Sequence, residues 1–237
     1  MNSVQFEPVV PVGDDIVTAK YKTPFSLSRT VIVLLDDAHK SFLVYSPGEP
    51  LLEQAQNIIA KDADVILMAP SLGHTLGIAS WLRAYPRARL TATEATVEKL
   101  TKQGLTDIRV VTPEAIQLEL PEHIQLTRLP DCTSGELWLT ILKKGRTYWL
   151  ACDGVMNLPA LSENWIKRLL QRLYGLKLGL WMTPTFISNI THKDQFKIWF
   201  KEWLGEAEEP VLIPCHGDVY LERDLVERLA HLIEIRL

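Results

Sequence analysis

The sequence predicts an α/β (α+β) fold in which two sheets carry helices on their outer sides. In the first half, short apolar runs alternate with segments of helical periodicity, which is typical of parallel strands joined by helical crossovers. At the start of the chain and again after residue 123, strand-like segments follow one another across short polar turns, which indicates antiparallel pairing. A chain of 237 residues can bury a large core without a disulfide or a metal. We therefore expect a single domain, residues 1–237, built from two similar halves.

Three strands are expected first, at residues 16–21, 30–35 and 41–45, because these segments are rich in Val and Ile. A helix is then expected to begin at Pro50, because apolar residues recur at helical spacing through Ile59.

The stretch from residue 63 to residue 92 is the centre of the predicted fold. Residues 64–68 form a short apolar run without alternation, which favours a strand buried on both faces. A loop then ends at His74, and apolar residues from Ile78 onward recur as in an amphipathic helix until Pro86. Ligands in layered α/β folds commonly lie at the carboxyl ends of buried strands, so His74 is a candidate site residue.

The remaining elements follow from the same patterns. A strand at 89–92, a helix at 93–102 and a strand at 108–111 complete the first half. The second half is expected to contain strands at 124–129, 137–142, 147–151 and 211–214, and helices at 158–174, at 193–203 and from Val219 onward with Asp218 as its N-cap.

Composition excludes several classes of function. A net charge of −4 without a basic stripe gives no footprint for nucleic acid. No uncharged apolar run approaches the ~20 residues needed to span a bilayer, and the first residues lack the features of a signal peptide. We therefore expect a cytoplasmic protein without a nucleic-acid or membrane partner. Its three cysteines are expected to stay reduced.

Three further strand ends carry polar or thiol residues. They lie at residues 129–135, 150–154 and 214–218 and present these side chains: Cys132, Cys152, Asp153, Cys215 and His216. His, Cys and Asp are ligands of divalent transition metals, and neighbouring glycines let the backbone approach an ion. No pair has the local spacing of a metal motif, so ordinary structural roles stay open.

The order of these stretches, from about Val17 to Val219, resembles the metallo-β-lactamase-fold superfamily, whose members are αββα four-layer sandwiches with a metal site at one sheet edge. From Phe42 to Leu90 the chain is also similar to a branch of that superfamily for which no substrate is established, and residues 43–47 and 81–86 carry this similarity. The first motif of the superfamily, H-x-H-x-D-H, is represented here by Ala69, Ser71, Gly73 and His74, so three of its four ligands are missing.

The resemblance also implies roles for the later strand ends. Asp153 stands at the position of the bridging aspartate, His216 at that of the last histidine, and Cys132 at that of a glycine-flanked histidine. The chain should therefore hold at most one ion, on His74, Asp153 and His216 plus water. Zinc is the first choice, iron the second, and Cys132 is a possible further ligand. The structural alternatives are that His74 packs at a helix start, that Asp153 is a turn residue, and that Cys132 is a small buried hydrophobe.

Two functions follow from this reading. A metal-dependent hydrolase would use the ion to lower the pKa of bound water toward ~7 and to polarise an ester, amide or phosphoester oxygen of a small-molecule substrate. With Gly73 in place of an aspartate, the motif supplies no evident general base. The alternative is a non-catalytic binding or regulatory scaffold that has lost its metal centre, so whether the chain is an enzyme stays open. The sequence further predicts that the three ligands converge, that Cys132 lies beside them, and that the fold forms without metal.

Overall fold

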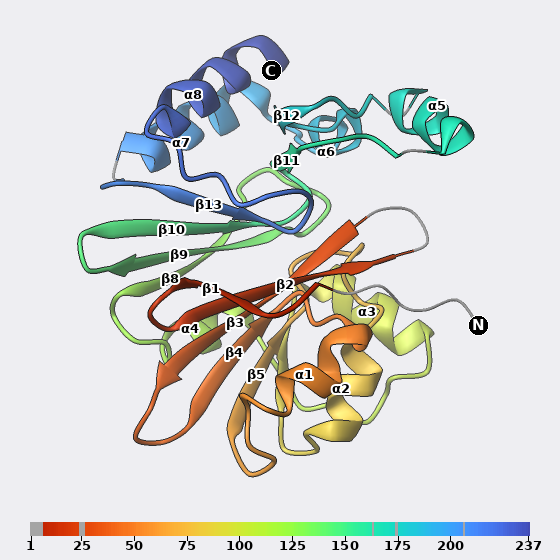
Figure 1. Cartoon of the computed structure of the whole chain (residues 1–237), viewed down its shortest axis with the longest axis vertical. Coiled ribbons are helices and arrows are strands. Elements are labelled where there is room, and N and C mark those ends of the chain that lie inside the picture. Colours follow the sequence, from red (N-terminus) through yellow and green to blue (C-terminus); the bar gives the residue numbers. More distant parts are fainter. Residues whose placement is uncertain (1–6, 24–26, 163, 174, 206) are drawn as a thin grey trace. The chain divides into compact units, whose positions relative to one another are not determined.

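A seven-stranded sheet forms the centre of the N-terminal unit, Met1–Pro121 (Figure 1). The computed structural model describes residues 7–23, 27–162, 164–173, 175–205 and 207–237. The sheet strands follow one another in chain order: β1 (Val10–Gly13), β2 (Ile16–Lys22), β3 (Leu27–Asp36), β4 (Ser41–Tyr45), β5 (Asp64–Met68), β6 (Arg89–Thr91) and β7 (Val110–Val111). Strands β1 to β4 pair antiparallel and β4 to β7 pair parallel, so both predicted modes of pairing are confirmed.

Helices connect the parallel strands of this unit and carry its core. The helices are η1 (Glu49–Leu51), α1 (Leu52–Ala55), α2 (Ile78–Ala84), α3 (Glu94–Lys102) and α4 (Pro113–Gln117). Trp81 and Tyr85 of the α2 region stack at 5.9 Å between ring centroids and pack in one apolar cluster with Val65 and Leu67 of β5. The Trp81 indole N–H donates to the Gly48 carbonyl at 3.0 Å. These contacts fix the two ends of the loop between β5 and α2.

The C-terminal unit, Glu122–Leu237, contains a four-stranded sheet in the order β13-β10-β9-β8. Its strands are β8 (Ile124–Arg128), β9 (Leu137–Lys143), β10 (Arg146–Ala151) and β13 (Val211–Pro214), and a separate two-stranded sheet joins β11 (Met156–Leu158) to β12 (Gly179–Trp181). The meander predicted for β8 to β10 is confirmed, whereas β13 pairs parallel to β10. The chain thus divides into two compact units, and the prediction that they form one domain stays a prediction.

Aromatic side chains dominate the core of the C-terminal unit. Its helices are α5 (Trp165–Leu173), α6 (Pro184–Ser188), α7 (Lys193–Gly205) and α8 (Leu225–Arg236). Trp203 of α7 stacks on Trp149 of β10 at 4.2 Å and lies 5.0 Å from Trp138 of β9, measured between ring centroids. Such contacts add to the free energy that burial alone supplies. None of the described helices is long and apolar enough to cross a membrane.

Three predicted helices differ from those observed. The helix expected at 158–174 begins at Trp165, because residues 156–158 pair with β12 instead; Tyr174 lies outside the described residues. The helix expected from Val219 begins at Leu225, because Tyr220 pairs with Leu212, and Asp218 is therefore not its N-cap. The helix expected from Pro50 ends early, with η1 and α1 together reaching only residue 55.

Candidate metal centre

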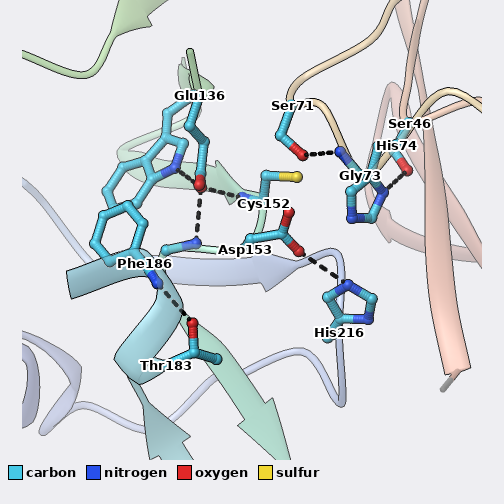
Figure 2. Close-up of polar contacts among 12 residues, drawn as sticks. Ser46, Ser71, Gly73, His74, Glu136, Cys152, Asp153, Thr183, Phe186 and His216 are labelled. Atoms are coloured by element: carbon cyan, nitrogen blue, oxygen red, sulfur yellow. Dashed lines mark hydrogen bonds and ion pairs between the residues drawn. The ribbon is translucent and has the colours of Figure 1, made fainter. Parts of the chain in front are cut away.

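Two predicted metal ligands lie side by side in the C-terminal unit. Strands β10 and β13 are parallel and in register, with Ala151 opposite Pro214, so the residues that follow both strands reach the same sheet edge. There His216 Nε2 lies 3.1 Å from Asp153 Oδ1 (Figure 2). Parallel pairing therefore joins two ligands that are 63 positions apart in the chain.

Glycines permit the backbone to pass close by at this edge. Gly217 has φ +95°, and a Cβ there would lie 1.8 Å from the Asn157 carbonyl oxygen, so only glycine fits. At Gly154 a Cβ would meet the Trp138 ring at 2.9 Å and Glu136 Oε1 at 3.0 Å. Close packing against neighbouring protein atoms therefore requires glycine at both positions, and the approach of this backbone to an ion stays a prediction.

A buried carboxyl group, Glu136, holds the loop that carries Asp153. Its Oε1 accepts hydrogen bonds from the Trp138 indole N–H at 2.6 Å, the Gly154 N–H at 2.8 Å and the Cys152 N–H at 3.2 Å. The residue is completely buried, and its other oxygen, Oε2, has no hydrogen-bond partner among the described residues. The two backbone donors flank Asp153, so Glu136 fixes the position of that ligand (Figure 2).

The electrostatic setting of Glu136 is unusual. Burial and then the nearby Asp153 carboxylate raise the pKa of Glu136 to about 8, against the opposing effect of the Trp138 and Gly154 hydrogen bonds. At neutral pH this carboxyl group is therefore mostly protonated. Sequence reasoning missed Glu136, and the available signal was an acidic residue placed directly before the apolar strand that starts at Leu137.

Two buried thiols lie next to the paired ligands. Cys152 precedes Asp153, Cys215 precedes His216, and the two thiol groups hydrogen-bond each other. Burial, the Cys215 contact and the Asp153 charge raise the pKa of the Cys152 thiol well above its ordinary value. None of the three cysteines forms a disulfide within the described residues, and their staying reduced remains a prediction.

Cys132 belongs to the same unit and lies in the loop that follows β8. Its sulfur is 3.0 Å from the Ser134 hydroxyl, and its backbone forms a bridge with Ile190. The half-buried side chain packs against the aromatic core, and burial raises the pKa of the thiol. A role of Cys132 as a metal ligand stays a prediction.

The N-terminal unit supplies His74, in the loop between β5 and α2. His74 is buried, and its Nδ1 lies 2.7 Å from the Ser46 hydroxyl (Figure 2). The His74 N–H donates to the Ser71 carbonyl at 3.1 Å, and the Ser71 hydroxyl accepts from the Gly73 N–H at the same distance. Because the Ser46 hydroxyl engages Nδ1, the nitrogen suited to hold a metal is Nε2.

Ser46 has a strained backbone that sequence reasoning did not anticipate. Its φ is +54°, a left-handed conformation that non-glycine residues rarely adopt. The Thr30 hydroxyl donates to the Ser46 carbonyl at 2.7 Å and accepts from the Gly48 N–H at 2.9 Å, while the Ser46 N–H donates to the Met68 carbonyl at 3.0 Å. Strain that surrounding bonds maintain in this way is often found at functional sites.

The geometry thus pairs Asp153 with His216 inside the C-terminal unit and orients His74 inside the N-terminal unit. Convergence of the three on one ion stays a prediction.

Comparison with solved structures identifies the fold. DIM-1 metallo-β-lactamase aligns over 98% of this chain and 99% of its own, with 13% identity and a TM-score of 0.62. The metallo-β-lactamase of Hirschia baltica aligns over 96% and 98%, with 11% identity and a TM-score of 0.59. A metal-soaked Flv1 flavodiiron core from Synechocystis sp. PCC6803 aligns over 97% of this chain and 60% of its own, with 13% identity and a TM-score of 0.59.

The chain therefore has the metallo-β-lactamase fold, and the predicted fold class is confirmed. Searches against family models and against curated proteins give no match in sequence. At these identities the similarity establishes the fold and leaves the activity to the chemistry of the site.

Proposed function

We propose that this protein is a metal-dependent hydrolase whose single divalent ion is held by His74, Asp153 and His216 and completed by water. The observation that supports this most is the Asp153–His216 pair, 3.1 Å apart at the ends of two parallel strands in a metallo-β-lactamase fold. Two imidazoles and one carboxylate are the donor set of several catalytic zinc sites. When bound, such an ion would lower the pKa of water toward ~7 and polarise an ester, amide or phosphoester oxygen.

The electrostatics of the C-terminal unit support a cation beside Asp153. The Asp153 carboxylate is the strongest charged neighbour of both Glu136 and Cys152, and it raises the pKa of each group. Oε2 of Glu136 is buried and lacks a partner among the described residues. A divalent ion bound to Asp153 would offset the negative charge of that carboxylate.

The residues around the ligands would set the geometry of the site. Glu136 holds the backbone on both sides of Asp153, and the Ser46 hydroxyl fixes the ring of His74 so that Nε2 is the ligating nitrogen. Zinc suits these ligands best, and iron is the alternative, which the flavodiiron neighbour favours.

A second candidate function is a binding or regulatory scaffold without catalysis. Ala69, Ser71 and Gly73 offer none of the imidazole or carboxylate ligands of the first motif. The Ser71 hydroxyl moreover accepts from the Gly73 N–H, which gives it a role in the loop.

Elemental analysis of the purified protein, with and without prior chelation, distinguishes the two functions. The hydrolase predicts one zinc or iron per chain, lost in His74→Ala, Asp153→Asn and His216→Ala. The matched control is His192→Ala, because His192 forms a similar pair with Asp131 at 2.8 Å on the exposed surface of the same unit, and it should keep its metal. Metal-loaded protein should then hydrolyse model esters, amides or phosphoesters. Protein that is empty and does not take up added zinc or iron would support the scaffold.

A further inference from the structure

Helix α5 carries a large apolar surface that the described part of the chain leaves exposed. Between 48% and 75% of each of its apolar residues is accessible to solvent, and these residues are Trp165, Ile166, Leu169, Leu170 and Leu173. Leu178, which follows the helix, is 60% exposed. Contiguous exposed apolar patches of this kind usually mark a site of interaction.

The apolar residues of α5 lie on one face. At 3.6 residues per turn, the five positions fall within an arc of about 140°. An isolated helix of nine residues is unstable in water, so packing of its apolar face must supply most of its stability. A binding partner that covers this face would provide that packing.

The helix is attached to the rest of its unit through polar groups. The Gln171 side-chain oxygen accepts from the Ser162 N–H at 2.8 Å. At the other end, Gly175 has φ +75° and its N–H donates to the Arg172 carbonyl at 2.9 Å, while the Trp181 indole N–H donates to the Gly175 carbonyl at 2.6 Å. These bonds hold both ends of α5 and do not involve its apolar face.

The charge of this segment is opposite to that of the whole protein. Residues 164–181 contain four basic residues, Lys167, Arg168, Arg172 and Lys177, and no Asp or Glu, which gives +4 in a chain of net charge −4. Within the described ranges, neither Arg168 nor Arg172 forms a salt bridge. A surface that is both positively charged and apolar favours a binding partner whose surface is both negatively charged and apolar.

We propose that α5 and the loop through Leu178 dock on an anionic lipid surface. Tryptophan and leucine on one face, with basic residues beside them, are the composition of helices that lie in the membrane interface. A second copy of the same segment is disfavoured, because it would bring four positive charges toward four others. The expectation of no membrane partner rested on the lack of a spanning run, and an interfacial helix needs none. This inference does not depend on the proposed hydrolase activity.

Co-sedimentation with lipid vesicles tests the proposal. The 237-residue chain should bind vesicles of phosphatidylcholine with phosphatidylserine and should not bind pure phosphatidylcholine, and added salt should weaken binding. Arg168→Gln with Arg172→Gln should weaken it by roughly 25-fold, since each basic residue contributes about fivefold. Leu169→Glu with Leu173→Glu should abolish it. The matched control is Leu118→Glu with Leu221→Glu, two leucines that are 89% and 62% exposed elsewhere, and it should bind nearly as well as the parent.

Two results would overturn the proposal. One is binding that does not depend on phosphatidylserine or that survives Leu169→Glu with Leu173→Glu. The other is a dimer, seen by light scattering, that the same double variant splits, because a second copy would then be the occupant of the face. Circular dichroism of each variant checks that the fold is intact. Removal of metal by chelation should leave vesicle binding unchanged, which separates this proposal from the fate of the metal site.

Discussion

The two units present different chemistry at the ends of their central strands. In the N-terminal unit the loop after β5 has one imidazole, His74, which contacts the hydroxyl of Ser46. In the C-terminal unit the loops after β10 and β13 carry ionisable groups: Glu136 holds the first loop, and Asp153 and His216 lie together. The missing ligands of the first motif therefore belong to the N-terminal unit alone. The C-terminal unit thus carries the ionisable side chains of the candidate site, while the N-terminal unit orients one imidazole.

The two units also differ in the feature of the site that destabilises each of them. The C-terminal unit buries a carboxyl group of raised pKa, whose Oε2 has no partner among the described residues. The N-terminal unit instead holds Ser46 in a strained backbone conformation. Four predictions test this division, and they run from the largest expected change in stability to the smallest.

Replacing Glu136 with Ala should have the largest effect. It leaves the indole N–H of Trp138 and the N–H groups of Cys152 and Gly154 without their acceptor inside the protein, which should lower the free energy of unfolding by about 3–5 kcal/mol. Urea unfolding followed by circular dichroism measures this change. Glu119→Ala is the control in the N-terminal unit, because half-exposed Glu119 bonds to Arg89 and its loss should cost about 1 kcal/mol or less. Equal costs for the two variants would contradict the assigned role of Glu136.

Stability should depend on pH through Glu136. Its pKa is about 8 in the folded protein and ordinarily 4.5, so between these values the unfolded chain releases a proton that the folded chain keeps. The contribution to the free energy of unfolding therefore falls as pH rises from 4.5 to 8 and is constant outside that window. The Gln side chain of Glu136→Gln cannot ionise. The difference in the free energy of unfolding between variant and parent therefore isolates the contribution of Glu136 ionisation, and it should change by a few kcal/mol across this window in metal-free protein. If the difference in the free energy of unfolding did not change from pH 5 to pH 8, Glu136 would already be ionised in the folded protein.

Replacing Ser46 with Ala should cost about 1 kcal/mol, because it removes one buried hydrogen bond to His74 and leaves the backbone strain unchanged. The informative measurement is metal affinity, since loss of a bond that orients a ligating histidine typically weakens binding 10–100-fold. Ser80→Ala is the control, because it also removes a hydrogen bond of a buried serine, the one that the Ser80 hydroxyl accepts from Arg83 within α2. Equal metal affinity of the two variants would show that Ser46 does not orient a metal ligand.

Removal of the metal should have the smallest effect on the fold. His216→Ala should abolish metal uptake, yet its thermal midpoint should stay close to that of the metal-free parent, because the two hydrophobic clusters include none of His74, Asp153 and His216. Calorimetry of both proteins after chelation measures the midpoints. Two ions per chain, or collapse of the parent on chelation, would show that other ligands complete the site.

Periodicity and turn residues were sufficient to predict most strands, the parallel and antiparallel pairing of the first sheet and the meander of the second, but not the parallel pairing of β13 with β10. They also placed Asp153 and His216 at strand ends, and the in-register pairing of β10 with β13 explains why the two residues meet. Glu136 and Ser46 could not be found in this way, because their roles arise from contacts with residues far along the chain. The late start of α8 likewise depends on Tyr220 pairing with Leu212, which no local pattern shows.

The contact between Trp138 and Glu136 predicts that the fluorescence of the protein reports on the Glu136 carboxyl group. The Trp138 indole N–H donates to the Glu136 carboxyl group at 2.6 Å, while its ring lies 5.0 Å from that of Trp203. An excited indole is sensitive to the charge beside it, and neighbouring indoles exchange excitation energy at such distances. The intrinsic fluorescence of the chain should therefore respond to proton loss from Glu136. A change of charge beside Asp153 that alters the protonation of Glu136 would thus change the tryptophan fluorescence, without any added label.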